Sequence, residues 1–297
     1  MVCPVIWRKL LKSTRTTVAV QWPPPHWDAL PAQLQRDYTM DGKIAVPFEF
    51  HKEDRYAGQD NSISGVWKLD AMEALVHAPD SSGFPHSYGI PTTRDLGEVL
   101  RKHSSKTAGK TGLVIGTELP WVELLVVSKQ FGGAKQVWTL EYGKLYSEHP
   151  DFVTILPGEF AQLQLLTEKS DPIFDFAVTF SSVEHSGLGR YGDPLDAFGD
   201  LEAAAQVWCA LKEGGHFFLG IPTKPGTAFQ DELQYNAHRL YGHNRLAQIF
   251  ANFRLLEVIP MTQTHTWSIN NGEDTVVLMH TVFVLLKLPQ HGSSLHR

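Results

Sequence analysis

Runs of hydrophobic residues alternate with amphipathic stretches from residue 111 onward, a pattern typical of strands alternating with helices. Five buried strands are predicted over residues 112–116, 136–141, 152–156, 174–180 and 216–221. Helices are predicted over residues 119–131 and 200–211, the first with Pro120 in its opening turn and Gly132 at its end. This alternation predicts parallel strands joined by right-handed crossovers.

The C-terminal part follows a different pattern. Residues 254–259 and 280–287 are hydrophobic, and residues 270–274 between them carry a turn signal, so an antiparallel hairpin is favoured. Gly214 and Gly215 are expected only to shape the turn that leads into the strand predicted over residues 216–221. The sequence therefore predicts a Rossmann-like α/β fold. We expect a mostly parallel sheet of seven strands, a C-terminal antiparallel hairpin and helices on both faces.

The N-terminal third lacks this regularity. Residues 1–27 contain four basic and no acidic residues. They fit either a frayed basic arm or a short amphipathic helix that touches a membrane surface or serves as a transit segment. The sequence of residues 27–90 predicts an irregular extension. This extension either packs on the core of the α/β domain or covers a ligand-binding crevice of the sheet. We expect the arm and extension over residues 1–90, with a possible surface for a protein partner, and the α/β domain over residues 91–297.

Charge and composition narrow the functional classes. The 297 residues carry a net charge of −6, so no general nucleic-acid-binding surface is expected, because neutralising phosphates needs a positive footprint. No run approaches the roughly 20 apolar residues of a membrane span.

The cysteine content bears on the compartment. Cys3 and Cys209 are the only two cysteines; they predict no disulfide framework and no zinc site, and Cys209 is expected to be a buried free thiol. We therefore expect a reducing compartment, the cytoplasm, with an organelle as the alternative if the basic arm is a transit segment.

Polar and ionisable side chains gather directly after the strand predicted over residues 174–180. Ser181, Ser182, Glu184 and His185 follow it within five residues. In parallel α/β sheets, ligands bind in a crevice at the carboxyl ends of the strands. This segment is therefore the candidate chemical edge of the sheet.

Two segments near this edge carry a family resemblance: Ser181-Ser-Val-Glu-His-Ser-Gly-Leu-Gly-Arg-Tyr-Gly-Asp-Pro-Leu-Asp196 and Tyr235-Asn-Ala-His-Arg-Leu-Tyr-Gly242. Both resemble the family catalogued as domain of unknown function 268. Residues 111–288 as a whole resemble class I S-adenosylmethionine-dependent methyltransferases, whose seven-stranded sheet has its last strand inserted antiparallel. The resemblance implies S-adenosylmethionine as the cofactor.

The resemblance also implies which residues hold that cofactor. Methyltransferases place a glycine-rich turn against the methionine moiety. Here Gly116 and Thr117 precede Glu118, which stands where a second glycine is expected, so the cofactor either sits differently or is bound weakly or not at all. Glu141 matches the acid that accepts hydrogen bonds from both ribose hydroxyls. The expected set also includes Tyr142, Glu159 for the adenine amino group, Phe160 for packing on adenine, Ser181 and Ser182.

Methyl transfer to a hydroxyl needs a base for the departing proton. His185 is the first candidate because histidine titrates near neutral pH; the alternative is a histidine that only caps the loop. His238 is the second candidate, and Asp193, in the loop after His185, is the third. The acids of this loop would also suit a divalent cation, but a solvated loop is favoured and no metal is predicted.

The sequence thus favours an S-adenosylmethionine-dependent methyltransferase that acts on the hydroxyl of a small acceptor. A carbohydrate would suit aromatic side chains that converge on the crevice. The candidates for this role are Trp67, Tyr88, Tyr191, Tyr235 and Tyr241. The alternative is a catalytically inactive methyltransferase-like domain that serves as a binding or assembly module, which the glycine-poor first turn favours. A nicotinamide-dependent oxidoreductase is disfavoured, because no Gly-x-Gly-x-x-Gly fingerprint follows the first strand.

Overall fold

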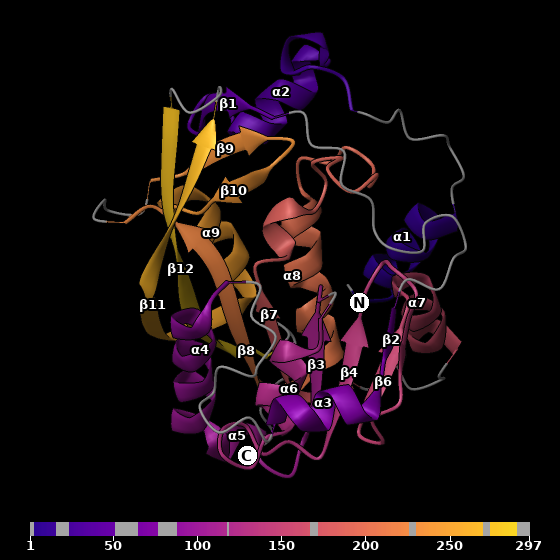
Figure 1. The fold of residues 1–297 in the computed structure, drawn as a ribbon. Helices are drawn as coiled ribbons and strands as arrows, with labels where there is room; N and C mark the ends of the chain where they lie inside the picture. Colours follow the sequence, from indigo (N-terminus) through magenta and orange to yellow (C-terminus); the bar gives the residue numbers. More distant parts are fainter. Residues whose placement is uncertain are drawn as a thin grey trace.

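Seven strands form the central sheet of the computed structural model, in the order β11-β12-β8-β7-β3-β4-β6 (Figure 1). The parallel strands are β3 (Thr111–Ile115), β4 (Gln136–Leu140), β6 (Phe152–Ile155), β7 (Phe174–Phe180) and β8 (Leu211–Thr223). β12 (Asp274–Lys287) pairs antiparallel with both β8 and β11 (Phe253–Ile269) and lies between them. The structure describes residues 3–15, 24–50, 65–76, 88–117, 119–166, 172–225, 230–269 and 274–289.

The predicted mostly parallel sheet and its terminal hairpin are confirmed. β7 has the predicted bounds; β3 and β8 pair with its two edges, and its side chains pack in the core clusters on both faces of the sheet. This position explains its nearly continuous apolar sequence. The two glycines expected to form a turn before β8 lie inside that strand instead. Gly214 has a φ of 72°, and the pairing between β7 and β8 shifts its register nearby.

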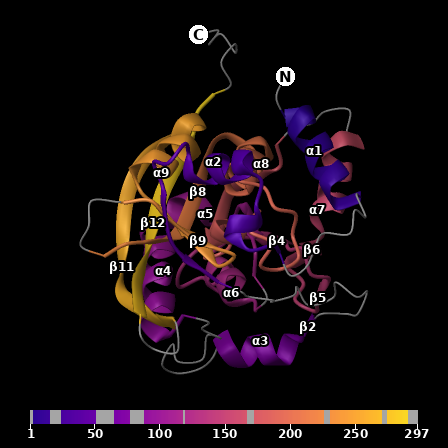
Figure 2. The same ribbon diagram turned by 90° about the horizontal axis from the view of Figure 1, so that it is seen from above.

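Helices cover both faces of the sheet (Figure 2). On one face, α4 (Ile90–Lys102) and α6 (Trp121–Val127) bury Leu100 and Leu124 against β7 and its neighbours. The short α5 (Ser104–Thr107) follows α4. The other face carries α7 (Pro157–Leu166), α8 (Gly199–Ala210) and α9 (His243–Ile249). α6 is shorter than predicted because Ser128 leaves the helical conformation, with a ψ of 126°.

The N-terminal extension contains regular elements. β1 (Ala45–Glu49) pairs in parallel with β9 (Glu232–Tyr235), which forms a hairpin with β10 (His238–Leu240). β2 (Gly65–Trp67) pairs in parallel with β5 (Leu145–Ser147). The extension also contains α2 (Ala32–Thr39) and α3 (Leu69–Val76). The described parts of the extension therefore pack on the α/β domain, one of the two predicted alternatives, and the division at residue 90 remains a prediction.

The basic N-terminal segment forms a docked helix. α1 (Cys3–Arg15) packs against α7 and α8 and buries Trp7 and Leu10. The alternative of a frayed arm is therefore wrong, because residues 3–15 form a helix whose apolar face is covered by the domain itself. Among the described residues, no helix is long and apolar enough to cross a membrane.

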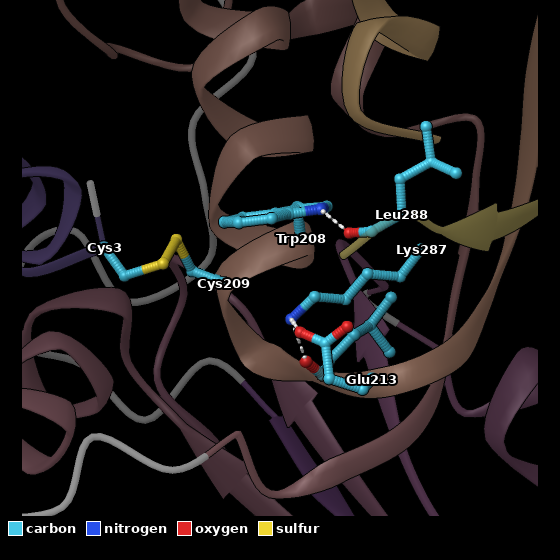
Figure 3. Close-up of a disulfide and its surroundings, with 7 residues drawn as sticks. Cys3, Trp208, Cys209, Glu213, Lys287 and Leu288 are labelled. Carbon is cyan, nitrogen blue, oxygen red and sulfur yellow. Dashed lines mark hydrogen bonds and ion pairs between the residues drawn. A yellow bond between two sulfur atoms is a disulfide. The ribbon is translucent and has the colours of Figure 1, made fainter. Parts of the chain in front are cut away.

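Cys3 of α1 forms a disulfide with Cys209 of α8, with their Cα atoms 5.5 Å apart (Figure 3). The expectation of no disulfide, with a free thiol at Cys209, is therefore wrong. The two cysteines are 206 residues apart in sequence, and only the docking of α1 brings them together. A sequence pattern cannot show this proximity.

Candidate active site

A pocket opens at the carboxyl ends of β3, β4 and β7. The sheet order reverses between β3 and β7, since the chain continues through β4 and β6 on one side and β8 on the other. Open α/β sheets bind their ligands at such a switch point. The space inside the pocket, together with the open solvent at its mouth, amounts to about 590 Å³.

Predicted site residues from three strand ends meet in this pocket. They are Gly116 and Thr117 after β3, Glu141 after β4, and Ser181, Ser182 and His185 after β7. The separate segments converge because the parallel strands that carry them end at the same edge of the sheet.

Gly116 forms the first turn and lies against Ser182. Its φ is 69°, and its amide donates a hydrogen bond to the carbonyl oxygen of Leu140 (3.1 Å). A Cβ atom at this position would overlap the Ser182 side chain. Glycine is thus required here both by the backbone conformation and by the close approach of β7. Glu118, which stands where a second glycine of this turn was expected, lies outside the described residues.

Glu141 is 5% exposed and has a fixed orientation. Its Oε1 accepts hydrogen bonds from the backbone amides of Tyr142 (2.6 Å) and Gly143 (3.3 Å). A carboxylate has further lone pairs that can accept from a vicinal diol. Beneath it, Glu123 is fully buried and accepts from the Thr139 hydroxyl (2.8 Å). Burial, with a contribution from the charge of Glu141, raises the pKa of Glu123 to about 8.

The end of β7 turns sharply at Ser181. This residue has a φ of 49°, uncommon for a residue other than glycine, and its amide donates to the Gly220 carbonyl oxygen (2.9 Å). Its hydroxyl donates to Oε1 of Glu184 (2.6 Å). Glu184 is fully buried in the short helix η2 (Val183–His185), and burial raises the pKa of its carboxyl to about 7.

His185 has one ring nitrogen committed to the backbone. Its Nδ1 lies 2.6 Å from the carbonyl oxygen of Ala237, in the turn between β9 and β10. Because a carbonyl oxygen only accepts, Nδ1 must carry the proton of this hydrogen bond, and Nε2 is then the acceptor nitrogen of the neutral ring. His185 as a whole is 9% exposed, and it lines the pocket.

The other two candidate catalytic residues do not line the pocket. His238 is buried in β10, with its ring centroid 6.1 Å from that of His185. Asp193 shapes the loop after His185: its carboxylate accepts from the amides of Gly187 (2.7 Å) and Tyr191 (3.3 Å). Burial raises the pKa of Asp193 despite these bonds.

Three of the residues predicted to hold the cofactor are not among those that line the pocket. The ring of Phe160 is buried in the core, edge-on to Trp7 with 5.3 Å between centroids. Glu159 is exposed and accepts a hydrogen bond from the Leu156 amide (3.1 Å) at the start of α7. Tyr142 is half exposed, after Glu141.

Aromatic residues complete the pocket. Of the rings proposed to converge, Tyr88 and Tyr191 line it. The other rings proposed to do so, Trp67, Tyr235 and Tyr241, are buried elsewhere. Leu119, Trp121 and Phe180 also line the pocket and were not predicted. The only sequence signal for these residues is their position next to the ends of β3 and β7. This signal does not separate pocket residues from core residues, because apolar side chains at strand ends are equally expected in the core.

A buried ionic cluster supports the loop of His185. The guanidinium of Arg239 donates to the carbonyl oxygens of Ser186 (2.7 Å) and Glu184 (3.2 Å). Nearby, Asp200 accepts hydrogen bonds from Arg245 Nε (2.9 Å) and the Tyr241 hydroxyl (3.0 Å). Hence the two segments that carry the family resemblance lie against each other.

The last strand, β12, lies antiparallel between β8 and β11, which is the arrangement that the resemblance to class I S-adenosylmethionine-dependent methyltransferases predicted. Residues 109–288 match the family described as Caenorhabditis protein of unknown function, DUF268. The chain belongs to this family.

The chain also resembles solved structures. One is the N-methyltransferase NodS from Bradyrhizobium japonicum WM9 in complex with S-adenosyl-L-homocysteine: 13% identity over 74% of this chain and 98% of that chain, with a TM-score of 0.42. Another is the 1,6-didemethyltoxoflavin-N1-methyltransferase of Burkholderia thailandensis: 13% identity over 67% of this chain and 79% of that chain, with a TM-score of 0.36. No curated protein matches the chain.

Proposed function

We propose that the protein is an S-adenosylmethionine-dependent methyltransferase that acts on a hydroxyl group of a small acceptor. The observation that carries this proposal is the convergence of Gly116, Glu141 and His185 on one pocket from the ends of three parallel strands. A tight turn, an oriented carboxylate and a histidine are the groups that the methionine moiety, the ribose and the acceptor hydroxyl respectively require.

The residues present fit the cofactor. Glu141 would accept hydrogen bonds from the ribose hydroxyls, because two backbone amides already hold its carboxylate in place. The turn of Gly116 and Thr117, closed by Ser182, would lie along the methionine moiety. When bound, the cofactor supplies a methyl group attached to a positively charged sulfur, and this sulfur becomes a neutral thioether once the methyl group is transferred.

His185 would accept the proton of the acceptor hydroxyl. The hydrogen bond from Nδ1 to Ala237 sets the tautomer and leaves Nε2 as the basic nitrogen. The same contact fixes the ring plane, so the base is oriented before a substrate arrives. A general base positioned in this way contributes roughly 10²–10⁴-fold to a rate.

The acceptor we favour is a carbohydrate. Tyr88 and Tyr191 line the pocket together with Trp121, and aromatic faces pack against the apolar faces of sugar rings. Hydroxyl groups of Ser181 and Ser182 at the same wall would hydrogen-bond the polar edges of such a ligand.

The second candidate function is that of a methyltransferase-like binding module without activity. The packing of Ser182 against Gly116 favours it, because a serine side chain takes up space beside the turn expected to approach the cofactor. In this case the N-terminal extension would offer the surface for a protein partner.

Calorimetric titration of the full chain with S-adenosylmethionine and S-adenosylhomocysteine tests the first proposal. We expect binding at micromolar to submillimolar concentrations. Glu141→Ala should weaken it about tenfold or more, because hydrogen bonds to a charged group contribute roughly 1.5–3 kcal/mol. The matched control is Glu98→Ala, a half-exposed acid of α4 that pairs with Arg101 and does not line the pocket; it should leave binding unchanged. Absence of binding at millimolar ligand would favour the binding module.

A further inference from the structure

Glu184 contacts the candidate base without lining the pocket. Its Oε1 accepts the hydrogen bond from Ser181 (2.6 Å) and lies 3.7 Å from Nε2 of His185. Its Oε2 is buried and has no hydrogen-bond partner among the described residues. Burial of a carboxyl group with one oxygen unpaired is costly, so its position beside a functional histidine requires an explanation.

Several segments bring charged or titratable groups to Glu184. His185 lies within ion-pair distance of Glu184, and Arg190 and Tyr241 interact with it electrostatically. His238 packs against the ring of His185, with 6.1 Å between the centroids. Arg190 favours the ionised carboxyl electrostatically, whereas burial opposes it. Arg239 hydrogen-bonds the backbone carbonyl of Glu184 and not its side chain. Burial and the charge of Arg190 thus act in opposite directions on the pKa of Glu184, and Nε2 of His185 lies 3.7 Å from its carboxylate.

We propose that Glu184 is a positioning residue for His185, whose carboxylate stabilises the imidazolium that forms when His185 takes up a proton. The inference rests on the proposed function for the proton donor, an acceptor hydroxyl. In that step the O–H bond breaks, an Nε2–H bond forms, and the ring gains one positive charge while Nδ1 keeps its proton. A carboxylate 3.7 Å from Nε2 offsets this charge, and poor solvation strengthens the effect.

The coupling can be measured without any ligand. Long-range ¹H–¹⁵N spectra of the full chain record the pH at which each histidine ring takes up a proton, and His185→Gln identifies the signal of His185. We expect Glu184→Gln to lower that pH for His185 by about one unit, since an opposite charge at this distance favours the protonated ring. Glu98→Gln, which removes a half-exposed carboxylate of α4 outside the pocket, should leave it unchanged.

An unchanged His185 titration in a folded Glu184→Gln variant would overturn the proposal. If that variant does not fold, Ser181→Ala provides the second test. Loss of the Ser181 hydrogen bond disfavours the ionised carboxyl and should shift the His185 titration in the same direction by a smaller amount; no shift would again overturn it. Calorimetry with S-adenosylhomocysteine on the same samples tests the proposed function separately, so either proposal can fail alone.

A second inference rests on the disulfide. Figure 3 shows how the turn of α8 that carries Cys209 is held. Cys3 binds it from the side of α1, and the neighbouring Trp208 donates its Nε1–H to the carbonyl oxygen of Leu288 (3.1 Å). The ammonium of Lys287 lies 4.6 Å from the centre of the Trp208 ring. Cys209 is 3% exposed, so the bond lies within the packed structure.

We infer that the protein matures in an oxidising compartment and not in the cytoplasm predicted from the sequence. The Cα separation of 5.5 Å fits a disulfide, and cytosolic thiol systems keep such pairs reduced. The bond would form by thiol–disulfide exchange with a dithiol oxidoreductase in its disulfide form. The two cysteines lose two electrons and two protons, and the oxidoreductase leaves as a dithiol.

Acid quenching of the cells that make the protein, followed by labelling with a maleimide polymer under denaturing conditions, tests this inference. A disulfide leaves the full chain unlabelled until a reductant is added, after which two labels attach and the gel band shifts twice. The Cys209→Ser variant should take one label without reductant, which shows that Cys3 is accessible to the reagent. Two labels on the wild-type chain before reduction would overturn the inference.

Discussion

The Nδ1 atom of His185 lies 2.6 Å from the carbonyl oxygen of Ala237, so the hairpin of β9 and β10 orients the candidate base at the end of β7. The same hairpin supplies Arg239, whose guanidinium holds the carbonyl oxygens of Glu184 and Ser186. The segment after β7 therefore depends on a hairpin roughly fifty residues further along the chain.

Gly116→Ala is expected to lower both stability and cofactor binding. The added Cβ would overlap Ser182, and a φ of 69° is unfavourable for a residue with a side chain. We expect a loss of about 1–3 kcal/mol in the free energy of unfolding, measured by urea denaturation. Adding Ser182→Gly should restore the part of the loss caused by the overlap. No recovery in the double variant would assign the whole loss to the backbone.

The sequence predicted the sheet well because its strands are local hydrophobic runs. β7 was predicted with its observed bounds since each face of a central strand is apolar. The antiparallel order of β11 and β12 followed from the turn signal between them. The docking of α1 was not predicted, because an amphipathic helix has the same pattern whether it packs on a domain or on another surface.

The site could be predicted only where it depends on strand ends. Glu141 and His185 follow directly from the bounds of β4 and β7, and the fold brings them to one pocket. Phe160 was expected at adenine but packs in the core against Trp7 of α1. Long-range partners such as Ala237, which fixes the His185 tautomer, leave no local signal, since any residue provides a backbone carbonyl.

Glu123 makes the stability of the protein depend on pH. Burial raises its pKa from 4.5 to about 8, so the folded state binds its proton more tightly than the unfolded state. This contribution is fully present below about pH 4.5 and is lost as the pH rises through about 8. Glu123→Gln keeps an acceptor for Thr139 and removes the titration. We expect it to raise the free energy of unfolding at pH 8 relative to the wild type by about 2–4 kcal/mol, with little difference at pH 4.5.

Urea denaturation across this pH range measures the effect of Glu123. Glu98→Gln is the control, because its carboxylate is half exposed and pairs with Arg101; it should change stability by less than about 0.5 kcal/mol. A Glu123→Gln difference from the wild type that stays constant with pH would contradict the assignment of this titration to Glu123.

Asp200 balances buried positive charge in the first turn of α8. It accepts hydrogen bonds from Arg245 and Tyr241, and although burial raises its pKa, the charges of Arg239 and Arg245 hold that pKa below its usual value. Asp200→Asn leaves the arginine charge uncompensated, and we expect a loss of about 3–5 kcal/mol in the free energy of unfolding.

Asp175→Asn is the matched control for Asp200→Asn. Asp175 pairs with Lys212 at 2.9 Å near the surface, and such exposed pairs contribute less than about 1 kcal/mol. Urea denaturation compares the two variants. Equal losses would show that the buried cluster does not stabilise the loop of His185 more than a surface ion pair would.

Loss of the Cys3–Cys209 disulfide is expected to destabilise the protein without unfolding it, since Trp7 still packs against Phe160. The bond links residues 206 apart, and restricting so long a loop in the unfolded chain typically stabilises by about 2–4 kcal/mol. For a chain of 297 residues we expect Tm to fall by about 3–6 °C in Cys209→Ser. Cys3→Ser and the double variant should show the same Tm, as should the reduced wild type, because each lacks the same bond. Additive losses in the double variant would show that the two cysteines stabilise the protein separately.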